Sequence, residues 1–254
     1  MKVIKNTTFI DLLNRYVTTY VLLPKNYHEK TMAYPVIYMH DGQNLFSHAD
    51  KFSKEIWNLK KVMNTQKLKE DVIIIGISSA KNTDRLNEFL PFSLEIRAYN
   101  QYGGHADKYL EYIANILKPH IDQTYRTNAL RTYMMGASLG GVISVYAGIK
   151  YPNIFKGVAS LSGAFFAVPV KLKSFIEKNI THRPTYIYMD CGDNETFNAT
   201  KETYLKTNQD IYETIQKNLK VGMVEYFIIP DGKHQESDWQ KRFSDVVNRL
   251  LSYT

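Results

Sequence analysis

The pentapeptide Gly136-Ala137-Ser138-Leu139-Gly140 constrains the fold of this chain more than any other feature, because it joins a strand-like segment to a helical one. Residues 130–135 before it are rich in strand-forming side chains, and residues 139–151 after it carry apolar side chains at helical spacing. A G-x-S-x-G pattern at such a junction is typical of a sharp turn that lifts the serine hydroxyl out of the sheet. The sequence therefore predicts a strand–turn–helix unit with Ser138 as a candidate nucleophile.

Strand-like and helical segments alternate along the rest of the chain. The expected strands are residues 15–23, 34–39, 71–77, 130–135, 157–161, 185–189 and 224–229, and the expected helices are 54–64, 106–121, 139–151, 200–219 and 238–253. The β-branched run 71–77 is typical of a strand buried on both faces. This alternation predicts an α/β fold with a central, mostly parallel sheet and helices on both faces.

The segment 79–104 is interpreted as a long irregular loop. Long loops inside compact domains are often functional, so a lid over the site is one interpretation of this segment. Arg85 and Glu88 are expected to form an ion pair that fixes it. The sequence leaves open whether the segment closes over the site.

Length and composition favour one compact unit. A chain of 254 residues, 44% of them hydrophobic, is long enough to bury a sizeable core, and we expect a single domain over residues 1–254. No stretch approaches the roughly 18 apolar residues of a membrane span, and the first residues carry no apolar signal segment. Cys191 is the only cysteine, which excludes an intramolecular disulfide and a cysteine-rich metal site. We expect a cytoplasmic protein.

The chain carries a net charge of +7, and this charge is spread along the predicted helix faces. Nucleic-acid binding requires clustered basic residues interleaved with aromatic ones, so we expect no nucleic acid and no membrane as partner. A weaker interpretation is that the positive charge steers an anionic substrate toward the protein. Both a monomer and a homodimer are compatible with the composition.

A serine nucleophile needs a base, and His234 is the candidate because it follows the last predicted strand. The carboxyl edge of an open parallel sheet is where such folds place their ligands. His182 precedes a strand and would lie at the opposite edge. A surface histidine at the start of a helix is the alternative interpretation of His234.

Three carboxylates follow the penultimate predicted strand and compete for the role of the acid that orients the base. Glu195 lies on the far side of the loop and has the reach to meet a histidine, so it is favoured over Asp193. Asp193 suits a turn around Gly192, and Asp190 closes the strand and is the third choice. Either favoured acid would hold the imidazole in its productive tautomer.

An oxyanion hole needs two backbone N–H donors. The Leu139 amide directly follows the serine, and the Gln43 amide lies in the loop after the strand 34–39. His40 and Asp41 begin the same loop and are interpreted as structural or pocket-lining residues. No carboxylate or histidine cluster accompanies His40, so no metal and no cofactor are expected.

Three motifs together resemble a known family of esterases. They are residues 40–46 (HDGQNLF), 136–141 (GASLGG) and 232–239 (GKHQESDW). The chain resembles, over residues 15–251, the family of α/β-hydrolases that holds enterochelin-esterase-like proteins, feruloyl and acetyl xylan esterases, esterase D and the antigen 85 mycolyltransferases. The segments RLNEF at 85–89 and YPNIF at 151–155 are also similar to segments of that family.

The resemblance implies an α/β-hydrolase fold and assigns roles to five residues. It implies that Ser138 is the nucleophile, His234 the base and Glu195 the acid, with the amides of Gln43 and Leu139 as oxyanion donors. Trp239 is similar to a tryptophan that follows the catalytic histidine in the enterochelin-esterase branch. Some siderophore esterases of the family act with a serine–histidine dyad, so the acid need not be essential.

Several aromatic residues are candidates for the core or for an acyl pocket. Phe165 and Phe166 follow the strand 157–161 at its carboxyl end, and Trp57 lies in the helical segment before 64. The sequence favours neither interpretation for these three residues. Cys191 lies beside the acid and is interpreted as a small packing residue.

The expected reaction is hydrolysis of a small-molecule carboxylic ester with a small or aromatic acyl group, such as a short acyl, feruloyl or siderophore-type ester. Acyl transfer and thioester hydrolysis use the same residues and are the enzymatic alternatives. The alternative of another class is a catalytically silent ligand-binding module on the same fold. The presence of the serine, acid and histidine in that order argues against the silent module.

Overall fold

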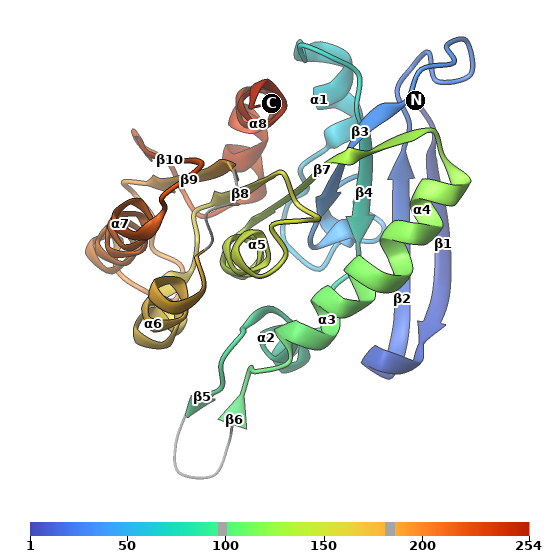
Figure 1. Cartoon of the computed structure of the whole chain (residues 1–254). Coiled ribbons are helices and arrows are strands. Elements are labelled where there is room, and N and C mark those ends of the chain that lie inside the picture. The colour runs from blue at the N-terminus through green and yellow to red at the C-terminus, as the bar shows by residue number, and fades with distance from the viewer. Residues whose placement is uncertain (96–100, 181–185, 254) are drawn as a thin grey trace.

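The computed structural model describes residues 1–95, 101–180 and 186–253. Its centre is a sheet of eight strands in the order β1-β2-β4-β3-β7-β8-β9-β10 (Figure 1). The strands are β1 (Val3–Ile10), β2 (Arg15–Leu22), β3 (Tyr34–Met39), β4 (Ile73–Ile77), β7 (Thr127–Ala137), β8 (Gly157–Leu161), β9 (Tyr186–Gly192) and β10 (Met223–Ile229). The six neighbouring strands β4, β3, β7, β8, β9 and β10 are parallel to one another. The strand β2 is antiparallel to both of its neighbours, β1 and β4. The mostly parallel sheet is confirmed.

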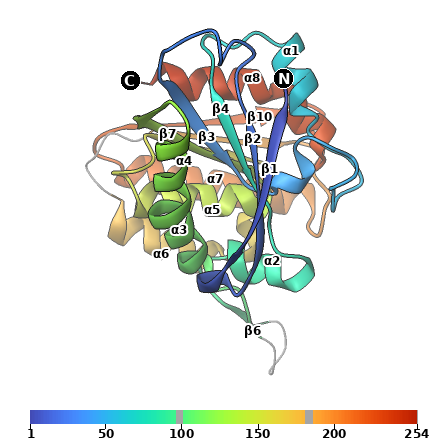
Figure 2. The ribbon, with the colours of Figure 1, turned by 90° about the vertical axis from the view of Figure 1, so that its right-hand side faces the viewer.

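Helices cover both faces of the sheet (Figures 1 and 2). One face packs against α1 (Leu59–Thr65) and α8 (Glu236–Ser252), and the other against α3 (Ala106–Tyr112), α4 (Lys118–Thr124), α5 (Leu139–Lys150), α6 (Pro169–Asn179) and α7 (Lys201–Asn218). Successive side chains of a strand point to opposite faces. Accordingly Ile73 and Ile75 belong to the core under α5, while Ile74 belongs to the core under α8. The α3 and α4 helices are joined by the π-helical turn Ile113–Leu117.

The first strand is absent from the expected set. In β1 only Ile10 is buried, because this strand pairs with β2 alone and lies at the edge of the sheet. Its sequence therefore lacks the apolar run by which the buried strands are recognised. The helix α6 is also absent from the expected helices. It buries only Leu172 and Ile176, so its apolar stripe is narrow.

The interpretation of residues 79–104 as an irregular loop is wrong in part. The segment contains α2 (Asn82–Phe89) and the short antiparallel strands β5 (Leu94–Glu95) and β6 (Gln101–Tyr102). The ion pair expected within it is also wrong. Arg85 binds Asp41 through two hydrogen bonds of 2.7 Å, and Glu88 binds Arg15, so both α2 side chains attach this helix to other parts of the chain.

The carboxyl ends of the parallel strands lie at one edge of the sheet. The loops that leave this edge begin after Met39, Ile77, Ala137, Leu161, Gly192 and Ile229. They carry the residues that the sequence assigned to the nucleophile, the acid, the base and the oxyanion donors. Within the described residues no helix has the length and hydropathy needed to cross a membrane.

Candidate active site

Ser138 occupies a strained turn between β7 and α5. Its backbone has φ 58° and ψ −123°, a conformation that side-chain-bearing residues rarely adopt. The Ser138 N–H donates to the Leu161 carbonyl at 3.0 Å, and the Ala164 N–H donates to the Ser138 carbonyl at 3.1 Å. A Cβ atom on Gly136 would lie 2.6 Å from the Gly140 backbone. Gly136 is therefore required by the close approach of strand and helix, whereas a Cβ atom on Gly140 would lie 3.3 Å from His40 Cβ.

Two backbone amides were expected as oxyanion donors, those of Gln43 and Leu139. Gln43 lies in the first turn after β3, and Leu139 is the first residue of α5. Among the described residues neither amide N–H has a hydrogen-bond acceptor. A Cβ atom on Gly42 would lie 2.6 Å from the Gly76 backbone, so this loop lies tightly against β4. The Gln43 side chain exchanges two hydrogen bonds with Ser79, at 3.0 and 3.1 Å, which fixes the position of the Gln43 amide.

Glu195 and His234 form a buried hydrogen bond. The distance between Glu195 Oε2 and His234 Nδ1 is 2.6 Å, and the side chains are 0% and 6% exposed. The other carboxylate oxygen accepts the Gly192 N–H at 3.1 Å. A Cβ atom on Gly192 would lie 2.2 Å from the Gly232 carbonyl oxygen, so the loops after β9 and β10 touch there. With Nδ1 bonded to the carboxylate, Nε2 has no partner among the described residues.

The competing acids have other partners. Asp193 Oδ1 accepts the Asp231 N–H at 2.7 Å, which ties together the turns that follow β9 and β10. Asp190 receives two hydrogen bonds from Arg242, at 2.7 and 2.9 Å, and one from the Tyr188 hydroxyl at 2.9 Å. Of the three candidates Glu195 is the one hydrogen-bonded to His234.

Trp239 connects the His234 loop to the loop behind the nucleophile. Its indole lies edge-on to the His234 ring at 5.0 Å, and its Nε1–H donates to Ser162 Oγ at 2.8 Å. Ser162 begins the loop whose Ala164 N–H donates to the Ser138 carbonyl. A short chain of contacts thus links the histidine with the serine turn.

The ion pair between Asp190 and Arg242 holds Ser162, the residue that accepts the Trp239 N–H, in position. The Asp190 side chain is fully buried, and Arg242 also donates to Ser162 Oγ at 3.1 Å. Replacing Arg242 by methionine leaves a buried carboxylate without its cation. We expect Arg242→Met to lower the free energy of unfolding by about 3–5 kcal/mol, measured by urea denaturation.

The matched control is the double variant Asp190→Asn with Arg242→Met, which removes both charges. We expect it to be more stable than Arg242→Met alone. Equal stability of the single and double variants would contradict an unpaired buried charge as the cause.

His40 lies beneath the nucleophile turn. Its ring is 3% exposed, and its Nδ1 lies 3.0 Å from the Tyr109 hydroxyl. A Cβ atom on Gly136 would lie 2.8 Å from His40 Cδ2. Burial lowers the pKa of His40 to about 3, so the ring is neutral at physiological pH. Asp41, which follows it, is bound by Arg85; burial raises its pKa, but the guanidinium charge and hydrogen bonds outweigh burial and the net pKa is lowered.

The neutral state of His40 makes stability depend on pH. Because an unfolded histidine has a pKa near 6.5 and the folded one about 3, the unfolded state binds the extra proton between these values. Stability is therefore full above pH 6.5 and falls as the pH decreases, by about 2 kcal/mol between pH 7 and pH 5. We expect His40→Asn to remove this part of the loss, as measured by urea denaturation at both pH values. An unchanged pH dependence in His40→Asn would contradict a neutral folded histidine.

Trp57, Phe165 and Phe166, which the sequence left open between the core and an acyl pocket, differ in burial. Trp57 is 4% exposed and packs against Trp239 and Phe243, and Phe165 is 0% exposed. The structure places both in the core. Phe166 is partly exposed and meets the Tyr204 ring edge-on at 5.0 Å. His182, the other histidine considered as base, lies outside the described residues.

Two aromatic residues beside His234 were absent from the predicted site. The Phe197 ring is stacked on the imidazole at 5.3 Å with an interplanar angle of 1°, and the Tyr204 ring lies 5.1 Å away. Phe197 is 56% exposed, so its ring is open to a ligand beside the histidine. An aromatic residue in a polar loop two positions after Glu195 is a signal that could have been used.

Potential metal ligands and the single cysteine complete the description of this edge for the described residues. Within the described ranges no three histidine, cysteine, aspartate or glutamate side chains are grouped as metal ligands. Cys191 is buried, and burial together with the neighbouring Glu195 and Asp190 carboxylates raises the pKa of its thiol. A thiol with a raised pKa is a poor nucleophile, which fits a packing role.

Comparison with known proteins agrees with this fold. The sequence model of the family described as "Putative esterase" matches residues 10–250. The chain belongs to this family. Membership supports carboxylic-ester hydrolysis as the class of reaction.

Individual relatives are more distant. The uncharacterized protein YbbA of Bacillus subtilis is 34% identical over 158 residues, which cover 60% of this chain and 58% of that protein. The crystal structure of an IroE-like serine hydrolase from Shewanella oneidensis superposes with a TM-score of 0.78 at 20% identity, covering 99% of this chain and 80% of that one. A ferulic acid esterase superposes with a TM-score of 0.73 at 19% identity, covering 100% and 99%. These structures show an α/β-hydrolase fold.

Proposed function

We propose that the chain is a serine esterase whose catalytic residues are Ser138, His234 and Glu195. In the first step Ser138 Oγ attacks the ester carbonyl while His234 Nε2 takes the hydroxyl proton. The bond from the carbonyl carbon to the alcohol oxygen then breaks, and the protonated histidine gives its proton to the departing alcohol. Water, deprotonated by His234, then attacks the acyl carbonyl. The bond from the acyl carbon to Ser138 Oγ breaks, the acid leaves, and the protonated His234 returns its proton to the serine oxygen.

The observation that carries this proposal is the Glu195–His234 hydrogen bond. A carboxylate bound to Nδ1 keeps the proton there, so the unprotonated Nε2 is the nitrogen that can accept a proton. The distance of 2.6 Å is that of a strong charge-assisted bond, and the buried carboxylate stabilises the imidazolium that forms in the reaction. A silent binding module has no need of this arrangement.

The amides of Gln43 and Leu139 are proposed as the oxyanion hole. Both N–H groups are without an acceptor among the described residues, and both belong to loops at the edge that carries Ser138. Leu139 also begins α5, whose amino-terminal dipole favours negative charge at the reacting carbonyl. Preorganised donors of this kind act most strongly where water is excluded.

The proposed substrate is a small-molecule ester with a small or aromatic acyl group. Support comes from the family, from the similarity to a serine hydrolase and to a ferulic acid esterase, and from the exposed Phe197 ring beside His234. We also propose that residues 1–254 act as one domain, because a single sheet contains strands from Val3 to Ile229 and α8 packs on it.

The test is hydrolysis of 4-nitrophenyl esters over a series of acyl lengths, combined with labelling by a fluorophosphonate. We expect turnover of short acyl esters and labelling of one residue, identified by mass spectrometry as Ser138. Feruloyl and catechol-type esters would then be compared with the best member of the series. Folded protein that neither hydrolyses any ester nor reacts with the probe would reject the proposal in favour of a silent binding module.

A further inference from the structure

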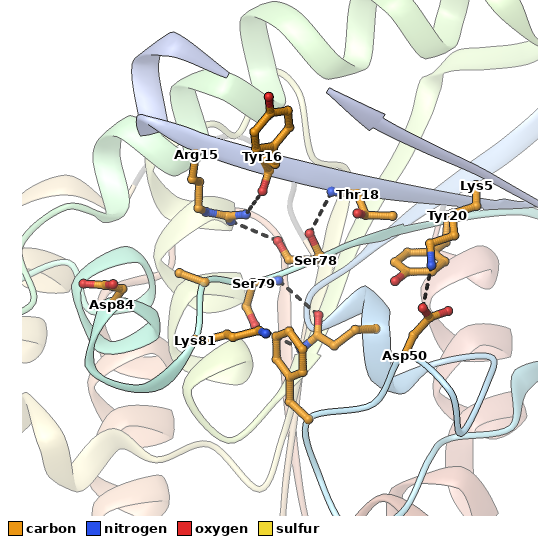
Figure 3. A pocket seen from close by; sticks show the side chains of 13 residues that line it. Lys5, Arg15, Tyr16, Thr18, Tyr20, Asp50, Ser78, Ser79, Lys81 and Asp84 are labelled. Carbon is orange, nitrogen blue, oxygen red and sulfur yellow. Dashed lines mark hydrogen bonds and ion pairs between the residues drawn. The ribbon is translucent and has the colours of Figure 1, made fainter. Parts of the chain in front are cut away.

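A cavity of about 360 Å³ adjoins the proposed oxyanion loop (Figure 3). It is open to solvent and is lined by residues of β1 and β2, of the loop after β3, and of the segment that leads from β4 into α2. Gln43 forms part of its wall through the side chain that is bonded to Ser79. The cavity therefore shares one lining residue, Gln43, with the proposed oxyanion hole.

Most charged groups of the cavity are already paired. Lys5 binds Asp50 at 2.5 Å, and Arg15 forms an ion pair with Glu88 and donates to the Ser78 carbonyl at 2.9 Å. These cations are therefore largely neutralised by their own carboxylates.

Lys81 is the exception among the lining cations. Within the described part of the chain it forms no ion pair, and its ammonium group lies 4.9 Å from the centre of the Phe52 ring. The Phe52 ring is 49% exposed. Asp84 lies farther out on the Lys81 side in Figure 3, and its carboxylate accepts a hydrogen bond from Asn87 at 3.4 Å. The cavity lining thus includes an exposed lysine that has no ion-pair partner among the described residues, and this lysine lies beside a half-exposed aromatic ring.

The Tyr20 hydroxyl adds a second donor. This hydroxyl has no hydrogen-bond partner among the described residues, and burial, followed by the Asp50 charge, raises the pKa of Tyr20 to about 12. The group is therefore protonated at neutral pH and available to donate. An ammonium and a phenol hydroxyl as the open groups favour a ligand that accepts hydrogen bonds and carries negative charge.

We propose that this cavity binds a carboxylate-bearing arm of the ester substrate, with Lys81 in contact with the carboxylate and the Phe52 ring beside it. The proposal rests on the function proposed above and narrows its substrate class to anionic esters. It follows from Lys81, for which the described residues provide no ion-pair partner, and from the position of Gln43 in the cavity lining.

The test compares anionic and neutral esters in matched pairs. The first pair is mono-4-nitrophenyl adipate and 4-nitrophenyl hexanoate, of which the adipate carries a carboxylate on the acyl arm. The second pair is 4-acetoxybenzoate and 4-acetoxybenzamide, of which the benzoate carries a carboxylate on the alcohol arm. We expect Lys81→Met to lower the anionic-to-neutral ratio of kcat/KM about fivefold for one pair, which identifies the arm in the cavity. Lys81→Arg should restore most of the ratio, and kcat/KM for the neutral esters should stay unchanged.

Lys178→Met is the control, because it removes the same charge from an exposed position on α6. It should leave both ratios unchanged. Ratios in Lys81→Met that equal those of the unmodified protein for both pairs would overturn the proposal, while turnover of neutral esters would still support the serine esterase.

If no ester is hydrolysed, the binding of a carboxylate to the cavity can be measured without any reaction. Calorimetric titration with 3-phenylpropionate and 3-phenylpropionamide should show tighter binding of the acid, and this preference should disappear in Lys81→Met. Equal binding of acid and amide would reject the cavity as a carboxylate site.

Discussion

Ser138→Ala is expected to lower kcat for the best ester about 10⁵- to 10⁶-fold, to the level that binding and the oxyanion donors alone provide. The alanine has no oxygen to form the acyl enzyme, so the reaction must proceed by direct attack of water. The measurement is the rate of 4-nitrophenolate release at saturating substrate. Fluorophosphonate labelling should disappear in the same variant.

The backbone at position 138 supplies the control for folding. Alanine tolerates φ 58° and ψ −123° no better than serine, so Ser138→Ala should keep the stability of the parent. Glycine adopts this conformation without strain, and Ser138→Gly should be equally inactive but about 1 kcal/mol more stable. Residual activity in Ser138→Ala within a hundredfold of the parent would identify another residue as the nucleophile.

The elbow could be predicted from sequence because its constraints are local. A strand, a glycine-flanked serine and a helix stand in consecutive positions, and the structure has them as β7, Ser138 and α5. The buried parallel strands were recognisable for a similar reason, since burial on both faces produces continuous apolar runs. The edge strand β1 carries no such run, because six of its eight residues are exposed.

The partners of charged residues could not be predicted, because tertiary pairing leaves no local pattern. Arg85 and Glu88 are one helical turn apart, yet Arg85 binds Asp41 and Glu88 binds Arg15. The pairing of Arg242 with Asp190 spans 52 positions of sequence. The sequence favoured Glu195 as the partner of His234 over Asp193 and Asp190, but no local pattern separates three carboxylates that lie within six positions at the end of β9.

Glu195→Gln is expected to lower kcat about 10³- to 10⁴-fold with little change in KM. An amide at this position donates to Nδ1 instead of accepting from it, so the imidazole proton moves to Nε2. Nε2 can then no longer take the proton of Ser138, and no carboxylate stabilises an imidazolium. Steady-state kinetics on the same ester as for Ser138→Ala gives the comparison.

Asp193→Asn is the matched control, because it makes the same chemical change two residues away. Asp193 accepts the Asp231 N–H, and an asparagine carbonyl accepts it equally well. We therefore expect kcat within about threefold of the parent, since no catalytic group loses its partner. A large loss in Asp193→Asn with a small loss in Glu195→Gln would assign the acid to Asp193. A loss below tenfold in both variants would mean that the serine and the histidine act as a dyad.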